Sequence, residues 1–223
     1  MSMGTLFLIR HAQASFGAAD YDVLSETGHE QSRALGRALA RQGVRPDALF
    51  TGAQRRHRET LEGILDGMGV PPRAAQVHPG LNEFDFKALL DARFRGGTPP
   101  DNLHGDRKTH FRTLRDTVLA WQRDEVPNPP ETWAEFTARV EDARRAMARD
   151  GGDVLAISSG GAIGQMLAAA LGAPPEQQIR LQLQMKNCAV NRFVHSPRSF
   201  YLHGFNETPH IDASNTNAFL TYS

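Results

Sequence analysis

The stretch Thr5-Leu6-Phe7-Leu8-Ile9-Arg10-His11 decides the fold of this chain. Its first five residues form a short, mostly apolar run, which is typical of a strand buried on both faces of a parallel or mixed sheet. The run stops abruptly at Arg10-His11. Because ligands of open α/β sheets bind beyond the carboxyl ends of strands, this polar pair is a candidate functional site.

The same order, a short strand and then a helix, returns further along the chain. The expected strands are 48–51, 153–158, 188–194 and 199–205, of which the last two can form a hairpin around Ser196-Pro197. The expected helices are 27–42, 55–68, 133–149 and 162–171, the first capped by Ser25 or Thr27 and ended by Gly43. This alternation predicts a three-layer α/β/α sandwich around a mixed, mostly parallel sheet.

Residues 86–130 break the alternation. They hold Gly96-Gly97-Thr98-Pro99-Pro100, a helical segment near 112–123 and Pro127-Asn128-Pro129-Pro130. Long excursions in compact domains are usually functional, so we expect a cap or lid inserted over the end of the sheet. A disordered surface insertion is the alternative. With 223 residues, the size fits a single domain over residues 1–223 that carries this insertion.

Composition narrows the class of partner. Lys plus Arg equals Asp plus Glu at 25 each, so the formal net charge is zero and no nucleic-acid or anionic membrane surface is expected. No segment approaches the ~18 consecutive apolar residues of a membrane span. The single cysteine, Cys188, excludes an intramolecular disulfide and is expected to be a buried, inert thiol. We therefore expect a cytoplasmic protein, and its oligomeric state stays open.

Two more expected strand ends carry groups that suit an anion. Thr51-Gly52-Ala53-Gln54-Arg55-Arg56 brings cations and helix amides to the rim that holds Arg10-His11. Ser158-Ser159-Gly160-Gly161 adds hydroxyls, and its glycines allow close approach to the backbone. Three such ends on one sheet edge predict a phosphate pocket. Metal chemistry is not expected, because none of the nine histidines has a metal-binding spacing on an expected helix.

These residues resemble the histidine phosphatase superfamily, which includes phosphoglycerate mutases and many phosphatases. Five segments are each similar to one motif of the family. Leu8–Ala14 is similar to the Arg-His-Gly signature, and Leu24–Gln31 is similar to the Leu-Thr/Ser-x-x-Gly-x-x-Gln helix start. Thr51–Thr60 is similar to Ser-x-x-x-x-Arg-x-x-x-Thr, Leu81–Phe86 to Leu-x-Glu-x-x-Phe, and Val154–Ile163 to the Ser-His-Gly-Gly strand end. The matches run in order over most of the chain outside the insertion. The resemblance implies a phosphoglycerate mutase-like fold and no cofactor.

The resemblance also implies roles for particular residues. His11 would be the nucleophile, Arg10 and Arg56 would bind the phosphoryl group, and Glu83 would donate the proton to the leaving group. Gln13, Ser15, Ser159 and Gly160 are the remaining candidates for phosphate binding. The substrate would be a small phosphorylated molecule of unknown identity.

The sequence departs from the family pattern at three places. Ala12 stands in the glycine position of the Arg-His-Gly signature. Ser159 stands where the family usually has a second histidine, and Ala14 and Gly17 stand where mutases have Ser/Thr and Asn. Losing one such donor costs on the order of 10²–10³ in rate. The cations that can replace it are Arg55, His57, Arg58, His203 and His210, each of which we expect to face solvent.

Three functions follow from these features. The first is a phosphohydrolase that cleaves phosphomonoesters through a phosphohistidine on His11, with activity weakened by Ser159. The second is a non-catalytic phosphate-binding pseudophosphatase. The third is a phosphoglycerate-type mutase, which the residues at positions 14 and 17 disfavour. Specificity is expected to lie in the 86–130 insertion and near His210.

Overall fold

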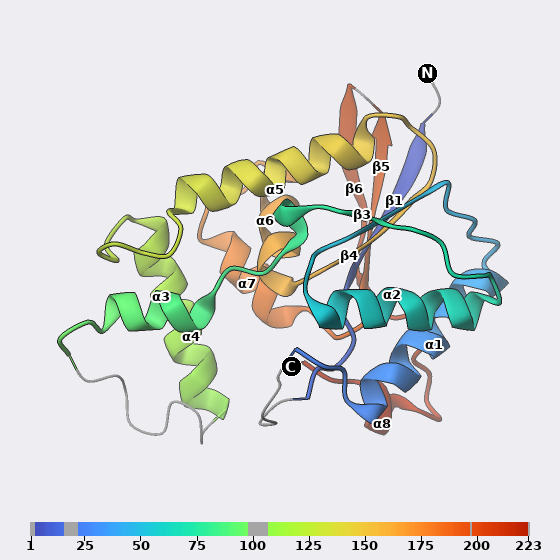
Figure 1. Cartoon of the computed structure of the whole chain (residues 1–223), viewed down its shortest axis with the longest axis horizontal. Coiled ribbons are helices and arrows are strands. Elements are labelled where there is room, and N and C mark those ends of the chain that lie inside the picture. The colour runs from blue at the N-terminus through green and yellow to red at the C-terminus, as the bar shows by residue number, and fades with distance from the viewer. Residues whose placement is uncertain (1–2, 16–21, 98–106, 197, 223) are drawn as a thin grey trace.

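A single mixed sheet forms the centre of the molecule (Figure 1). The computed structural model describes residues 3–15, 22–97, 107–196 and 198–222. Within these ranges the strand order is β3-β2-β4-β1-β5-β6. Neighbours among the first four pair in parallel, whereas β5 and β6 pair antiparallel. The strands are β1 (Gly4–Arg10), β2 (Ala48–Thr51), β3 (Gln76–Val77), β4 (Val154–Ser158), β5 (Val190–Ser196) and β6 (Ser199–Glu207). The predicted mixed, mostly parallel sheet is confirmed.

Side chains of β1 alternate between two separate hydrophobic clusters. Phe7 and Ile9 pack into the cluster built with α1 (Glu26–Arg41) and α2 (Arg55–Met68). Leu6 and Leu8 pack on the opposite face, in the cluster that contains residues of α5 (Trp133–Ala148) and α6 (Gly160–Ala170). Since successive side chains of a strand point to opposite faces, this partition gives the predicted three layers. Figure 1 shows them, with α6 to the left of the strands and α1 to the right.

Capping residues set the helix boundaries close to those predicted. The Ser25 hydroxyl accepts from the Gly28 amide at 3.0 Å and starts α1. Helix α2 ends where Gly69 takes a φ of 68°. The prediction for α6 was wrong at its start, because Ser159 is extended and acts as the N-cap, so that Gly160 is already helical rather than Ala162.

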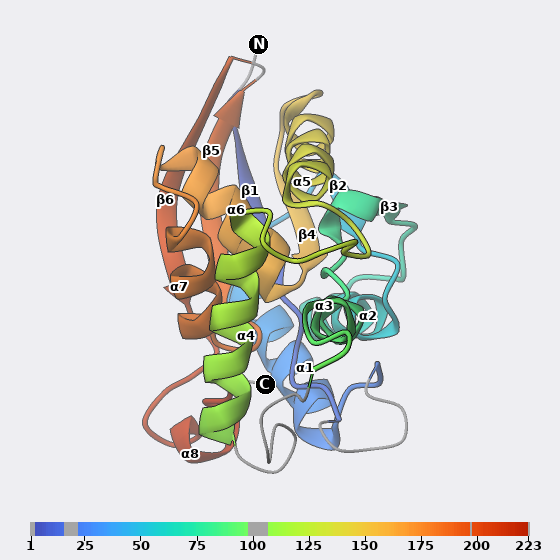
Figure 2. The same cartoon turned by 90° about the vertical axis from the view of Figure 1, so that its left-hand side faces the viewer.

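Two helices of the 86–130 region, α3 (Phe86–Arg93) and α4 (Arg107–Gln122), lie to one side of the sheet (Figures 1 and 2). We expected only a helical segment near 112–123. The region is anchored by Trp121, whose ring centroid lies 5.3 Å from those of Phe84 and Phe136. Residues 98–106 of the expected cap lie outside the described residues.

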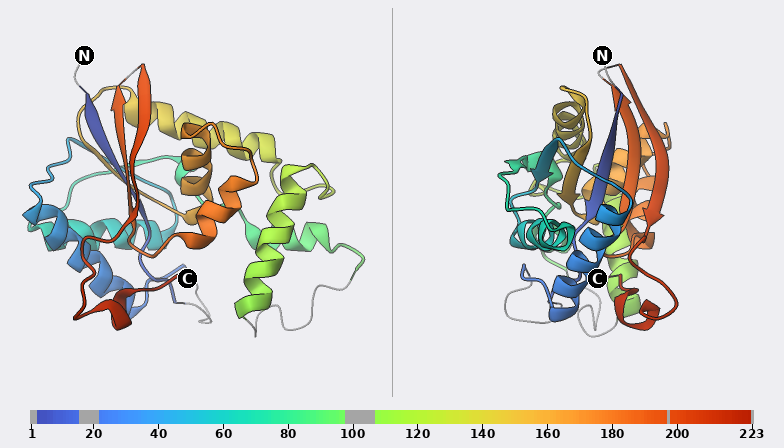
Figure 3. Two further views of the ribbon diagram at one scale, coloured as in Figure 1. Left: turned by 180° about the vertical axis from the view of Figure 1, so that it is seen from behind. Right: turned by 90° about the vertical axis from the view of Figure 1, so that its right-hand side faces the viewer.

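The C-terminal part adds α7 (Gln177–Gln184), the expected β5–β6 hairpin and α8 (Thr216–Phe219), with a 3-10 turn at Pro79–Leu81 earlier in the chain. Pro197 of the expected turn lies outside the described residues. Figure 3 shows α8 beside α1, where the Gln31 side chain donates to the Phe219 carbonyl at 2.9 Å.

Cys188 is buried, and desolvation raises the pKa of its thiol. Among the described residues, no helix combines the length and apolar character that a membrane crossing needs.

Candidate active site

His11 follows β1 directly and is buried at the carboxyl end of that strand. Its amide donates to the Ser158 carbonyl of β4 at 2.9 Å, which fixes the backbone to the neighbouring strand. The ring Nδ1 lies 2.7 Å from the Ala12 carbonyl oxygen. Because a carbonyl only accepts, Nδ1 carries the proton and the neutral ring keeps its lone pair on Nε2.

Burial and neighbouring cations keep this imidazole neutral. Desolvation holds the pKa of His11 well below its ordinary value, and the positive charges of Arg56 and Arg10 lower the pKa further. The Arg10 guanidinium donates to the Met185 carbonyl. Arg56 is buried and forms an ion pair with Asp22, with 2.6 Å between Nη1 and Oδ1. His11 is therefore a neutral base at physiological pH, held beside two permanent cations.

Thr60 links helix α2 to the loop that carries His11. Its hydroxyl accepts from the Ala12 amide at 3.0 Å and donates to the Arg56 carbonyl at 2.6 Å. Asp22 supports the same region by accepting from the Arg55 amide at 2.7 Å, at the first turn of α2. The strand end that holds His11 and the helix that holds Arg56 are thus fixed to each other.

Glu83 reaches the same area from the loop after the 3-10 turn. Its carboxylate accepts from the Gly161 amide of α6 at 3.0 Å and from the Phe84 amide at 3.2 Å. Desolvation nevertheless raises the pKa of Glu83, although these amides and the charges of Arg56 and Arg10 act in the opposite direction. A carboxyl group of this kind keeps a proton to higher pH than a solvated one, as a general acid requires.

The remaining candidates divide between those drawn into this cluster and those engaged elsewhere. Ser159 lies inside it, with its hydroxyl 2.7 Å from His57 Nε2 and 3.4 Å from Arg56 Nη2. Gly160 opens α6, and a Cβ built there would stand 3.7 Å from Arg10 Nε. In contrast, the Gln13 side chain accepts from the Ser25 hydroxyl at 2.8 Å. The Ser15 amide donates to the Val23 carbonyl at 2.8 Å.

The proposed replacement cations do not share one environment. Arg55, Arg58 and His203 are exposed, as expected. For two histidines the expectation of a solvent-facing side chain was wrong. His57 is fully buried, with its ring centroid 5.7 Å from that of His11. His210 is also buried, but within the C-terminal segment, where its ring centroid lies 6.4 Å from that of Phe219.

A profile of the histidine phosphatase superfamily (branch 1) matches residues 6–208, which cover all the residues of this cluster. The chain belongs to the histidine phosphatase superfamily. Among curated relatives, a 2,3-bisphosphoglycerate-dependent phosphoglycerate mutase of Mesorhizobium japonicum is 29% identical over 198 residues, spanning 80% of this chain and 87% of the relative. A phosphoglycerate mutase of the same description from Methylobacterium sp. is 32% identical over 67% of this chain and 76% of its own length.

Solved structures show the same fold at lower identity. A phosphoglycerate mutase from Bacillus anthracis superposes with a TM-score of 0.67 at 18% identity and covers 94% of this chain and 95% of its own. A mycobacterial glucosyl-3-phosphoglycerate phosphatase, solved with inorganic phosphate, superposes with a TM-score of 0.65 at 19% identity, covering 94% of this chain and 100% of its own. The superfamily fold predicted from the sequence is confirmed.

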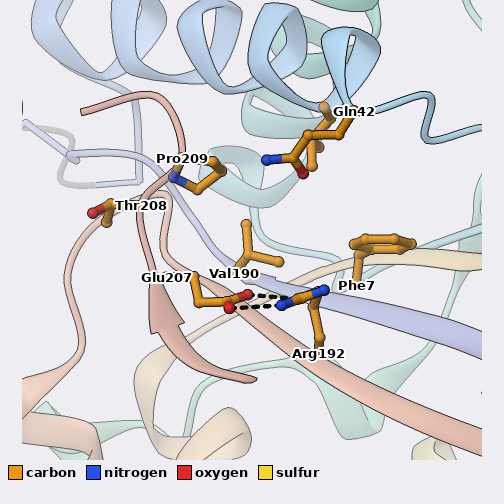
Figure 4. A pocket seen from close by; sticks show the side chains of 8 residues that line it. Phe7, Gln42, Val190, Arg192, Glu207, Thr208 and Pro209 are labelled. Carbon is orange, nitrogen blue, oxygen red and sulfur yellow. Dashed lines mark hydrogen bonds and ion pairs between the residues drawn. The ribbon is translucent and has the colours of Figure 1, made fainter. Parts of the chain in front are cut away.

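A separate hollow of about 380 Å³ lies between α1 and the β5–β6 side of the molecule (Figure 4). Its charged walls pair with each other, since Arg192 donates to Glu207 at 2.6 and 2.8 Å. None of the described residues that line it belongs to the His11 cluster. We therefore place the candidate site at the strand ends and not in this hollow.

Sequence reasoning missed two residues that hold the His11 cluster together. The Gln54 side-chain oxygen accepts from the Glu83 amide at 3.1 Å, and it lies 3.5 Å from the Ser159 hydroxyl. Asp22 binds Arg56 and the start of α2. Both residues lie inside or beside the quoted family motifs, but Gln and Asp are common at helix starts, so the residue type alone did not indicate a site.

Proposed function

We propose that this protein hydrolyses phosphomonoesters through a phosphohistidine formed on His11. The observation that carries the proposal is the arrangement at the strand ends: the Ala12 carbonyl leaves the His11 lone pair on Nε2, and the Gly161 amide holds the Glu83 carboxyl group nearby. Burial lowers the pKa of His11 and raises that of Glu83. An attacking base and a proton-bearing acid beside Arg10 and Arg56 are the set that in-line phosphoryl transfer requires.

The reaction runs in two steps. His11 Nε2 forms a bond to phosphorus while the ester P–O bond breaks, and Glu83 gives its proton to the departing alkoxide. Water then attacks the phosphohistidine, Glu83 takes up its proton, and the P–N bond breaks to release inorganic phosphate. Arg10 and Arg56 bind the phosphoryl oxygens, with Ser159 and Gly160 as further contacts. Gln13 and Ser15 would have to leave their present hydrogen bonds to join them.

Rapid-quench experiments with a ³²P-labelled aryl phosphate test this proposal. Wild-type protein should form an acid-labile phosphoenzyme and release phosphate, whereas His11→Ala should do neither. His29→Ala, which removes an imidazole from α1, is the matched control and should behave as wild type. A phosphoenzyme that persists in His11→Ala would refute the assignment of the nucleophile.

The curated relatives named as phosphoglycerate mutases support a mutase as the second candidate. A mutase returns the phosphoryl group to substrate, so it must protect the phosphoenzyme from water. Transfer to water and transfer to 3-phosphoglycerate, measured on the same phosphoenzyme, separate the two activities. A protein that binds vanadate but never forms a phosphoenzyme would be the pseudophosphatase.

We further propose that the chain is a single domain in which residues 86–130 form a cap that contributes to substrate choice. The contact of Trp121 with Phe84 supports this, because Phe84 directly follows Glu83. We also propose a cytoplasmic location, which the single free thiol of Cys188 supports, because disulfides are rare in that compartment.

A further inference from the structure

The Ser159 hydroxyl is held by side chains of the neighbouring strand–helix unit. Ser159 is the N-cap of α6, yet its side chain makes no capping hydrogen bond. Its Oγ lies instead 2.7 Å from His57 Nε2 and 3.4 Å from Arg56 Nη2, both on α2. Ser159, which follows β4, is therefore oriented by side chains of the helix that follows β2.

His57 is a neutral ring with one N–H. Desolvation holds its pKa well below the ordinary value, and the charges of Arg56 and Arg58 act in the same direction. Within the described part of the chain, its buried Nδ1 has no hydrogen-bond partner. A buried N–H without an acceptor is rare and costly, so the proton belongs on Nε2, where the Ser159 oxygen accepts it.

This tautomer decides what the Ser159 hydroxyl can do. A hydroxyl oxygen has two acceptor positions, and the N–H groups of His57 and Arg56 fill them. The O–H is then left to donate. It is directed at Gln54 Oε1 at 3.5 Å, a long contact that a phosphoryl oxygen can replace. The two donors acting on the Ser159 oxygen make its O–H a stronger donor. The rings of His11 and His57 lie 5.7 Å apart, so a phosphoryl group on His11 would be near this hydroxyl.

We propose that His57 is a positioning residue that makes Ser159 a hydrogen-bond donor to the phosphoryl group, so that the pair replaces one histidine at position 159. This inference rests on the proposed function. Gly52 makes the arrangement possible, because a Cβ there would stand 2.3 Å from His57 Nδ1. Because position 52 has no side chain, there is room for the His57 ring.

Two substitutions at position 57 separate hydrogen bonding from packing. His57→Gln places an amide N–H near the position of Nε2, whereas His57→Asn places one near Nδ1. We expect Asn to weaken orthovanadate binding in calorimetry and to slow phosphoenzyme formation by about 10²-fold, and Gln to restore most of both losses. The loss should fall on kcat more than on KM. Equal behaviour of Gln and Asn would overturn the proposal and leave His57 a packing residue.

A double-mutant cycle with Ser159→Ala tests whether the two residues act as one unit. Because His57 acts through Ser159, adding His57→Asn to Ser159→Ala should change vanadate affinity less than threefold. Additive losses would overturn the proposal. His29→Asn, which removes a histidine from α1, is the control, and thermal melting shows that each variant is folded.

The vanadate measurements also keep the two proposals apart. If wild-type protein forms no phosphoenzyme, the proposed function fails, but the Gln and Asn variants still show whether His57 orients Ser159 toward an oxyanion. If the phosphoenzyme forms and the variants bind vanadate equally, only the inference about His57 fails.

Discussion

Replacing Gly161 by alanine should disable the proton transfer from Glu83 without removing any charged group. A Cβ at this position would stand 2.1 Å from Glu83 Oε1 and 2.5 Å from Phe84 Cε1. Ordinary contacts begin at 3.4 Å, so the carboxyl group must retreat by more than about 1 Å or the helix must shift. Misplacing a reacting group by ~1 Å can cost on the order of 10² in rate.

The assay compares two phosphomonoesters that differ in their leaving group. An alkyl phosphate needs a proton on its departing oxygen, whereas a nitrophenyl phosphate does not. We expect Gly161→Ala to lower kcat/KM for the alkyl ester by about 10²-fold and for the nitrophenyl ester by less than ~10-fold. The leaving-group dependence therefore reports on Glu83 itself.

Gly36→Ala is the matched control for packing strain. Its Cβ would meet the Ile64 carbonyl oxygen at 2.1 Å, the same distance, but in the contact between α1 and α2. Both variants should lose roughly 1–3 kcal/mol of stability in chemical denaturation, and only Gly161→Ala should change the ratio of the two substrates. Equal losses on both esters in Gly161→Ala would refute the role of Glu83 as the leaving-group acid.

Three further predictions follow from the hydrogen bonds and pKa shifts. Initial rates with an alkyl phosphate should rise with pH below 6.5, as His11 loses its proton, and fall as Glu83 loses its own at a pH above 4.5. Thr60→Val leaves the buried Ala12 amide without its acceptor and should cost roughly 1–3 kcal/mol in urea denaturation. Burial lowers the pKa of His210 from 6.5 to about 4. Between these pH values the unfolded chain binds a proton at His210 that the folded protein does not, so the free energy of unfolding decreases as the pH falls. Wild type should therefore lose roughly 3 kcal/mol more than His210→Leu between pH 7 and pH 4, and equal losses would contradict this.

Local signals predicted the elements that have clear boundaries. Ser25 caps α1 as expected, because a hydroxyl before a helix can accept from its first turn. Helix α7 was missed because Ile179, Leu181 and Leu183 alternate with polar residues, a period typical of a strand. The two residues of β3, Gln76 and Val77, are too few to produce any pattern.

From position in the chain alone, the candidate site could be predicted as far as the residues at strand ends, whereas Glu83 was indicated only by the family resemblance. Arg10 and His11 interrupt an apolar run, so the sequence indicated that they lie at the end of the strand. The burial of His57 was not, because the side chain beside Arg56 on a helix is expected to diverge from it. The signal that could have indicated it is Gly52, but a glycine after a strand is also an ordinary turn residue.

The adjacency of β2 and β4 bears on how such sequences diverge. Thr51 and Ile157 are direct partners in the sheet, so the chain segments that follow them start one strand spacing apart, about 4.8 Å. A donor lost from one segment can be regained from the other, because either lies within the reach of a single side chain. A histidine after β2 and a histidine after β4 would therefore serve the same site from neighbouring strands. A motif that demands one residue at one fixed position would not recognise such an arrangement.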